Sequence, residues 1–102
     1  MVALIEDKRD SIAALCRRFG VVRMDAFGSV LREDFRPGKS DVDLLVEFSD
    51  RDPYELAQAY FDLLDELKAL LGGEVDLVMA GAVKNPYIAS DIETTKRLLY
   101  AA

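Results

Sequence analysis

The chain has 102 residues with 13 basic and 19 acidic side chains, a formal net charge of −6 and 51% hydrophobic residues. This balance predicts one globular domain over residues 1–102 and excludes a disordered chain. No apolar run approaches the roughly 20 residues of a membrane span, and the negative charge argues against direct nucleic-acid binding. The absence of histidine excludes imidazole as a base, proton shuttle or metal ligand.

The start of the chain carries no sign of a targeting segment. Charged residues occupy positions 6–10, where a signal peptide needs an unbroken apolar run. We therefore expect a cytoplasmic protein without membrane attachment. The single cysteine, Cys16, lies on the apolar stripe of the first predicted helix, which favours a small buried hydrophobe over a reactive thiol.

Hydrophobic periodicity and breaker residues divide the chain into short elements. Gly20 and Gly72 are placed to end helices, Ser29 to cap a helical turn, and Asn85 with Pro86 to open the last helix. In chain order, the pattern predicts a helix over 2–19, a strand over 21–27, a helical turn over 29–33, a loop over 34–40, a strand over 41–48, a helix over 54–71, a strand over 74–79 and a helix from 87 to about 100.

This order predicts a small α/β (α+β) domain, in which helices pack on one face of a three-stranded mixed sheet. The other face of the sheet is predicted to carry acids. In the last helix we expect Leu98 in the core, whereas Tyr87 and Tyr100 fit either the core or an apolar surface for a partner.

Three acids are predicted on the bare face of the sheet. Asp41 and Asp43 are two residues apart at the head of an apolar strand, so their side chains project from the same face, and Asp76 occupies a similar place in the next strand. Two such charges 4 Å apart repel by about 4 kcal/mol at an effective dielectric near 20. Protonation or a bound cation must relieve this repulsion. Oxygen ligands without histidine or cysteine favour magnesium, and two ions bridged by carboxylates would serve a phosphoryl or nucleotidyl transfer.

A Gly-Ser turn precedes these acids. Glycine at position 28 lets the backbone approach a phosphate, and the free N–H groups after Ser29 attract an anion. Arg32 lies one turn further and is predicted to contact the same phosphates, although a solvated surface charge fits it almost equally well. Ser40 directly precedes the acids and is a further nucleotide-binding candidate, but its position is more typical of a turn residue.

The stretch G-S-V-L-R-E-D-F-R-P-G-K-S-D-V-D-L-L-V-E-F resembles the signature of the minimal nucleotidyltransferases, the smallest members of the DNA polymerase β superfamily. The similarity continues through V-D-L-V to N-P-Y-I-A-S-D-I-E-T-T-K-R-L-L-Y-A-A. It implies a polymerase β-like core in which Asp41 and Asp43 bind two magnesium ions, while Asp76 completes the catalytic ion's site and helps to deprotonate the acceptor. It also implies that Gly28 and Ser29 hold the triphosphate of ATP.

Polymerases, tRNA nucleotidyltransferases and aminoglycoside nucleotidyltransferases add a second domain for the acceptor, so the resemblance implies that a partner brings the acceptor here. The stand-alone form is similar to the antitoxin of a toxin–antitoxin module whose toxin is a helical HEPN ribonuclease. This implies a complex with the toxin and transfer of AMP from ATP to a toxin tyrosine. Two alternatives remain open: a binding antitoxin that occludes the toxin without catalysis, and a nucleotidyltransferase that acts on a small molecule.

Overall fold

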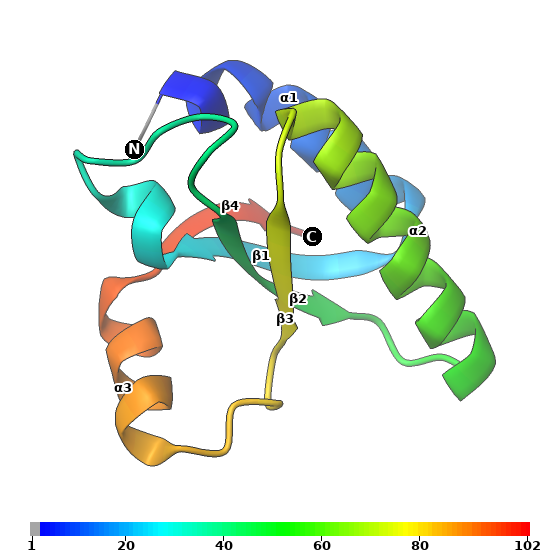
Figure 1. The fold of residues 1–102 in the computed structure, drawn as a ribbon. Coiled ribbons are helices and arrows are strands. Elements are labelled where there is room, and N and C mark those ends of the chain that lie inside the picture. The colour runs from blue at the N-terminus through cyan, green and yellow to red at the C-terminus, as the bar shows by residue number, and fades with distance from the viewer. Residues whose placement is uncertain (1–2) are drawn as a thin grey trace.

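The computed structural model describes residues 3–102 as three α-helices, a short 3-10 helix and one four-stranded sheet (Figure 1). Within this range, no helix combines the length and the apolar composition that crossing a membrane requires. In chain order the elements are α1 (Ala3–Arg18), β1 (Val21–Phe27), η1 (Gly28–Leu31), β2 (Val42–Phe48), α2 (Pro53–Leu71), β3 (Val75–Met79), α3 (Pro86–Thr95) and β4 (Arg97–Ala101).

The sheet has the strand order β3-β2-β1-β4 and mixes both strand directions. The central strands β1 and β2 are antiparallel, β4 pairs antiparallel with β1, and β3 pairs parallel with β2. The predicted α+β class with a mixed sheet is confirmed. The predicted strand number is wrong, because the sheet has a fourth strand.

The fourth strand comes from the segment predicted as the end of the last helix. The hydroxyl groups of Thr94 and Thr95 donate to carbonyl groups three or four residues back, which competes with the helical backbone bonds. The Lys96 N–H still donates to the Ile92 carbonyl, but Lys96 itself has an extended conformation with ψ 151°. The following residues then pair with the free edge of β1, so a tertiary contact overrides the local helical pattern.

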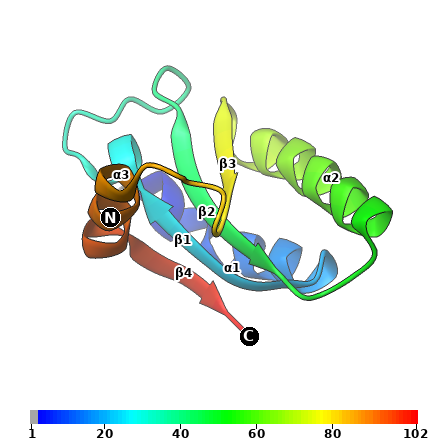
Figure 2. The ribbon, with the colours of Figure 1, turned by 90° about the horizontal axis from the view of Figure 1, so that it is seen from below.

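The hydrophobic core lies between the sheet and the pair α1 and α2, which cover the same face (Figure 2). The alternation predicted for β2 is confirmed, because Val42, Leu44 and Val46 are buried in this core. Cys16 is also buried there, and burial raises the pKa of its thiol to about 12, so the group stays protonated at neutral pH. The prediction of a small buried hydrophobe is therefore confirmed.

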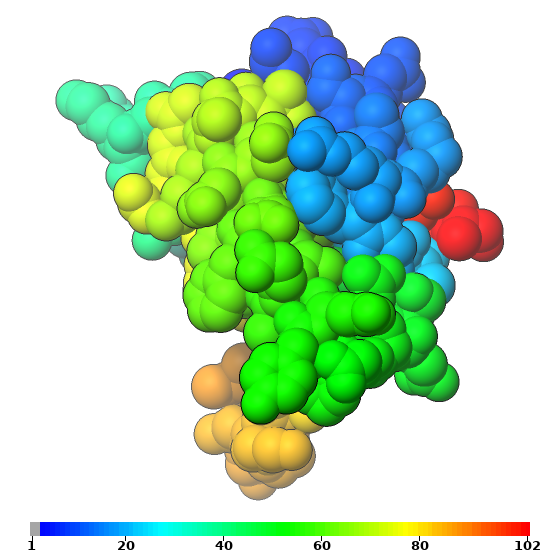
Figure 3. All heavy atoms as spheres, turned by 90° about the vertical axis from the view of Figure 1, so that its right-hand side faces the viewer, coloured from blue at the N-terminus to red at the C-terminus, as the bar shows by residue number. Residues whose placement is uncertain are grey.

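Not all helices lie on that face. Helix α3 projects away from α1 and α2 (Figure 3). It lines a small hollow together with Leu45. The side chain of Leu45 lies on the face of β2 opposite to that of Leu44. The expectation that Leu98 is a core residue is also wrong. Leu98 pairs with Asp25 on the opposite face and is 45% exposed, whereas the neighbouring Leu99 is buried.

The caps of α2 and α3 agree with the sequence pattern. The Asp52 side chain accepts from the N–H groups of the first turn of α2, and Gly72 ends this helix with φ 71°. At α3, Asn85 accepts from the N–H groups of Tyr87 and Ile88. The long loop between η1 and β2 is fixed by buried Phe35, and its Gly38 lies against the turn at Gly73, where an added Cβ would come within 3.3 Å of the Gly38 Cα.

Candidate active site

The candidate site lies at the head of the two parallel strands. Asp43 on β2 and Asp76 on β3 are direct neighbours across the parallel pair, so their side chains project from the same face of the sheet. Asp43 also pairs with Phe27, the last residue of β1. Asp41 precedes β2 by one residue and is exposed, as is Asp76. The structure thus places the three predicted acids on neighbouring backbone segments at one end of the sheet.

Gly28 brings the Gly-Ser turn against these acids. It has φ +67°, a left-handed conformation that favours glycine, and a Cβ built on it would overlap Oδ2 of Asp43. The next residue, Ser29, donates its backbone N–H to Oδ2 of Asp43 at 3.4 Å and its hydroxyl to the Asp41 carbonyl at 2.7 Å. The turn and the acids therefore form one connected unit.

The capping role predicted for Ser29 is wrong. The short helix that follows β1 is a 3-10 helix with Phe27 as its N-terminal flanking residue, and no side chain caps it. The Ser29 hydroxyl is used instead in the bond to the Asp41 carbonyl. This bond links the end of β1 to the start of β2, which is a tertiary role that local sequence does not reveal.

The electrostatic environment of Asp43 is unfavourable for its negative charge. Burial raises the pKa of Asp43, and the charges of Asp76 and Asp41 raise it further, while the Ser29 N–H and the Arg32 guanidinium oppose this shift. Within the described part of the chain, no three acidic or cysteine side chains are gathered as the ligands of a metal ion would be. The donor set itself consists of carboxylate oxygens, which fits a hard divalent cation.

Two further candidates, Arg32 and Ser40, lie at the edge of the site. Arg32 is exposed, and its Nε lies 3.6 Å from an oxygen of Asp34. Ser40 lies in the loop before β2, where its hydroxyl accepts from the Arg36 N–H at 3.1 Å and its own N–H donates to the Arg36 carbonyl at 2.8 Å. These bonds give Ser40 a turn role, and a nucleotide contact for either residue stays a prediction.

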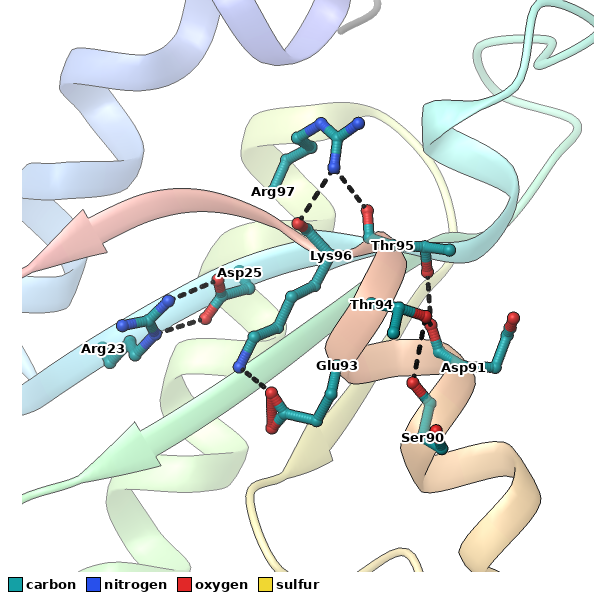
Figure 4. A network of polar contacts seen from close by, with 9 residues as sticks. All are labelled: Arg23, Asp25, Ser90, Asp91, Glu93, Thr94, Thr95, Lys96 and Arg97. Carbon is teal, nitrogen blue, oxygen red and sulfur yellow. Dashed lines mark hydrogen bonds and ion pairs between the residues drawn. The ribbon is translucent and has the colours of Figure 1, made fainter.

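A hollow of about 530 Å³ opens beside Gly28, between η1 and the end of α3. Arg32, Arg97 and Asp91 line it, so two cationic residues and one acidic residue border the same space. Figure 4 shows how Arg97 is held at the junction of α3 and β4, where its Nη1 donates to the carbonyl groups of Thr95 and Lys96. Sequence reasoning missed Arg97 because a helix was predicted there, and no local signal brings it to Gly28.

A second feature that sequence reasoning missed is an ion pair on β1 between buried Asp25 and exposed Arg23. Asp25 is only 1% exposed, and its two oxygens accept from Nε and Nη2 of Arg23 at 2.8 and 3.1 Å (Figure 4). Across from it, Lys96 binds Glu93 at 2.7 Å. The opposite charges two residues apart on a strand were the available signal, because they predict side chains on one face.

Sequence comparison identifies relatives of this chain. The model of the family described as nucleotidyltransferase domain matches residues 8–99. A candidate protein adenylyltransferase from Methanocaldococcus jannaschii is 44% identical over 79 residues, which cover 78% of this chain and 76% of the relative. Protein adenylyltransferase MntA from Thermococcus cleftensis is 39% identical over 71 residues, which cover 70% of this chain and 68% of the relative.

Solved structures share the fold. A candidate minimal nucleotidyltransferase is 32% identical with a TM-score of 0.67, over 91% of this chain and 90% of that one. At 22% identity and a TM-score of 0.65, the chain also matches an MNT antitoxin complex with the tri-AMPylated HEPN toxin of Shewanella oneidensis, over 95% of this chain and 72% of that one. A toxin–antitoxin structure with AMP-PNP is 23% identical to this chain with a TM-score of 0.68, over 92% of this chain and 73% of that one.

The Gly-Ser turn contacts Asp43, which lies beside Asp76 on the neighbouring strand, as the sequence pattern predicts. Together with the family match and the relatives, this arrangement shows that the chain belongs to the nucleotidyltransferase domain family and is a nucleotidyltransferase.

Proposed function

We propose that this chain is a magnesium-dependent protein adenylyltransferase that acts as an antitoxin by transferring AMP from ATP to a tyrosine of a HEPN toxin. The observation that carries the proposal is the contact of the Gly28-Ser29 turn with Asp43, beside Asp76 on the next strand. The names of the relatives support protein as the acceptor. The structures that share the fold include toxin–antitoxin complexes, one with an AMPylated HEPN toxin and one with AMP-PNP.

Binding of two magnesium ions would draw the three acids together, because in the described residues they are not gathered as the ligands of a metal ion would be. Asp41, Asp43 and Asp76 offer oxygen ligands at one end of the sheet. Burial first, and then the charges of Asp76 and Asp41, raise the pKa of Asp43, and a bound cation would offset both effects. Bound magnesium would neutralise charge that develops on the phosphates during the transfer. Asp41 and Asp43 would hold both ions, and Asp76 would complete one of the two sites.

The Gly-Ser turn and the neighbouring hollow would bind ATP. Gly28 lets the turn pack against Asp43, where a Cβ would overlap the carboxylate, so a triphosphate bound beside Asp43 would lie next to the backbone N–H groups of the turn. Arg32 would add a charged contact from the rim of the site. The hollow of about 530 Å³ that Arg32 and Arg97 line is large enough for the nucleoside.

In the proposed reaction the phenol oxygen of the acceptor tyrosine attacks the α-phosphorus of ATP. A new bond forms between this oxygen and phosphorus, the bond from the α-phosphorus to the bridging oxygen breaks, and pyrophosphate leaves with its electron pair. The phenol proton passes to the Asp76 carboxylate, which is exposed on the face where the acceptor would approach. The products are tyrosine-bound AMP and pyrophosphate.

The test is the intact mass of the product of the adjacent gene, which we expect to be a HEPN protein, after incubation with the chain, ATP and magnesium. We expect a gain of one or more AMP units with wild type, and no gain with Asp43→Asn or after chelation of magnesium. Gain at the wild-type rate with Asp43→Asn would refute the role of Asp43. No gain in a complex that still forms would instead favour an antitoxin that acts by occlusion.

A further inference from the structure

An apolar groove runs along the outer edge of the sheet, between α2 and β3. It has a volume of about 540 Å³, and we call it the α2–β3 groove. Its walls come from the first half of α2 and from the end of β3 with the turn that follows. The lining residues used below are Ala57, Tyr60, Phe61, Leu77, Met79 and Ala82.

The groove exposes aromatic surface that the fold does not need. Phe61 is 59% exposed, and its ring meets that of Tyr60 edge to face with centroids 5.2 Å apart. Tyr54, two turns earlier at the start of α2, is 87% exposed. Large exposed apolar side chains that gather beside a hollow are typical of an interaction surface.

The edge of β3 is closed to strand addition. The outward carbonyl of Leu77 accepts the Tyr60 hydroxyl at 2.6 Å, and the carbonyl of Met79 accepts the Ala82 N–H at 3.0 Å. A strand added at this edge would have to displace both bonds. The groove therefore fits side chains from a partner helix better than it fits an extended peptide.

The charge around the groove selects the kind of partner. Among the described lining residues only Arg51 is charged, and its guanidinium donates to the Ser49 hydroxyl at 3.2 Å. Outside the lining, α2 carries Asp62 and exposed Asp65 after Phe61, and the whole chain has a net charge of −6. A second copy of this chain would place these acids against their own counterparts, which is repulsive. A helix with an apolar residue between basic residues would complement both the groove and its rim.

The groove reaches the strand that carries Asp76. Leu77 directly follows Asp76 on β3, but successive strand residues alternate faces, so the groove opens on the α2 side of β3 and the acid lies on the other side. Because β3 is an edge strand, a partner seated in the groove would reach Asp76 around this edge. Resting on the proposed function, we propose that the α2–β3 groove binds the acceptor protein through an apolar side chain on a basic helix. Docking there would supply the positioning that a second domain provides in other transferases.

The test compares the same substitution at two exposed positions of α2. Ala57→Arg fills the groove and adds a positive charge, whereas Ala69→Arg lies on α2 outside the groove and is the matched control. The rate of AMP transfer is measured against the concentration of the HEPN protein encoded beside this chain, and ATP binding is measured separately by equilibrium dialysis. We expect Ala57→Arg to raise the KM for the HEPN protein at least tenfold, with ATP affinity unchanged and Ala69→Arg like wild type.

A second variant, Phe61→Ala, keeps an exposed position and is expected to raise the same KM about tenfold. If both groove variants transfer AMP with KM values within twofold of wild type, the groove does not bind the acceptor. The proposed function would remain. If wild type transfers no AMP but binds the HEPN protein, and Ala57→Arg weakens this binding, the groove is a docking site and the proposed AMP transfer is refuted. Wild type that neither binds nor modifies the HEPN protein, or a chain that self-associates through the groove in sedimentation, would refute the groove as the acceptor site.

Discussion

Gly28 has little freedom to change. Its φ of +67° costs a residue with a side chain about 1–2 kcal/mol, and a Cβ would also overlap Oδ2 of Asp43. We predict that Gly28→Ala lowers the rate of AMP transfer by about 100-fold or more, because it displaces a carboxylate of the site. Transfer kinetics and urea unfolding would measure the two effects.

Gly72→Ala is the control for this prediction. Gly72 has a similar φ of +71°, but nothing lies within 4 Å of an added Cβ. Gly72→Ala should therefore lower the free energy of unfolding by a comparable amount. It should keep the wild-type transfer rate at temperatures where the protein is folded. Equal rates for Gly28→Ala and wild type would contradict a close contact between the turn and Asp43.

Asp43 is predicted to cost stability when no cation is bound. Its pKa is raised in the folded protein by burial and by Asp76 and Asp41, so the folded state holds the proton more tightly than the unfolded state does. The stability that this proton contributes is complete below the unfolded pKa of about 3.9, and it is lost as the pH rises through the folded pKa.

Asp43→Asn should therefore melt at a higher temperature than wild type at pH 7.5 in a chelator. The difference should shrink as the pH falls towards 4, and saturating magnesium should raise the melting temperature of wild type only. Circular dichroism melts of both proteins, with the exposed Asp65→Asn as control, would measure this. A variant that melts below wild type at pH 7.5 without magnesium would show that the charge of Asp43 does not destabilise the folded protein.

At the scale of elements, the cap of α3 supports the hollow beside Gly28. The Asn85 side chain accepts from two N–H groups at 2.9 and 3.3 Å, and α3 forms one wall of the hollow. Asn85→Ala should cost about 1 kcal/mol and lower the melting temperature by about 4–8 °C. Under the proposed function it should also weaken ATP binding, while Asn85→Asp, which keeps a capping oxygen, should change little. Differential scanning calorimetry and ATP dialysis would check both effects.

The elements that sequence reasoning predicted well have local causes. The long helices follow from their period and caps, and the face of β2 that carries Asp43 follows from strand alternation. The strand β4 could not be predicted, because residues 97–101 become extended only through pairing with β1. The same limit explains why Arg97 was missed and why Leu98 was placed in the core.

The candidate site divides in the same way. Spacing in the sequence predicted that Asp41, Asp43 and Asp76 lie on one side of the sheet, and the structure places Asp43 and Asp76 as direct neighbours. The spacing of residues in the sequence did not predict that the Ser29 hydroxyl donates to the Asp41 carbonyl. That bond joins segments 12 residues apart, and only the closed β1–β2 pair brings them together.

At the scale of the whole molecule, the net charge of −6 should govern how fast a basic partner associates. We predict that the association rate with the HEPN protein falls by about tenfold between roughly 50 and 300 mM salt, while the dissociation rate changes less. Stopped-flow measurements at several salt concentrations would test this. An association rate that is independent of salt would contradict electrostatic attraction.

The contact between Gly38 and Gly73 has a consequence for the evolution of this family. An added Cβ at Gly73 would lie 3.3 Å from the Gly38 Cα, so the loop that leads to Asp41 and the turn that leads to Asp76 touch through bare backbone. A mutation that adds a side chain at position 73 has to be accompanied by a shorter or displaced loop. In an alignment of relatives, the residue at position 73 and the length of the 34–40 loop should therefore covary.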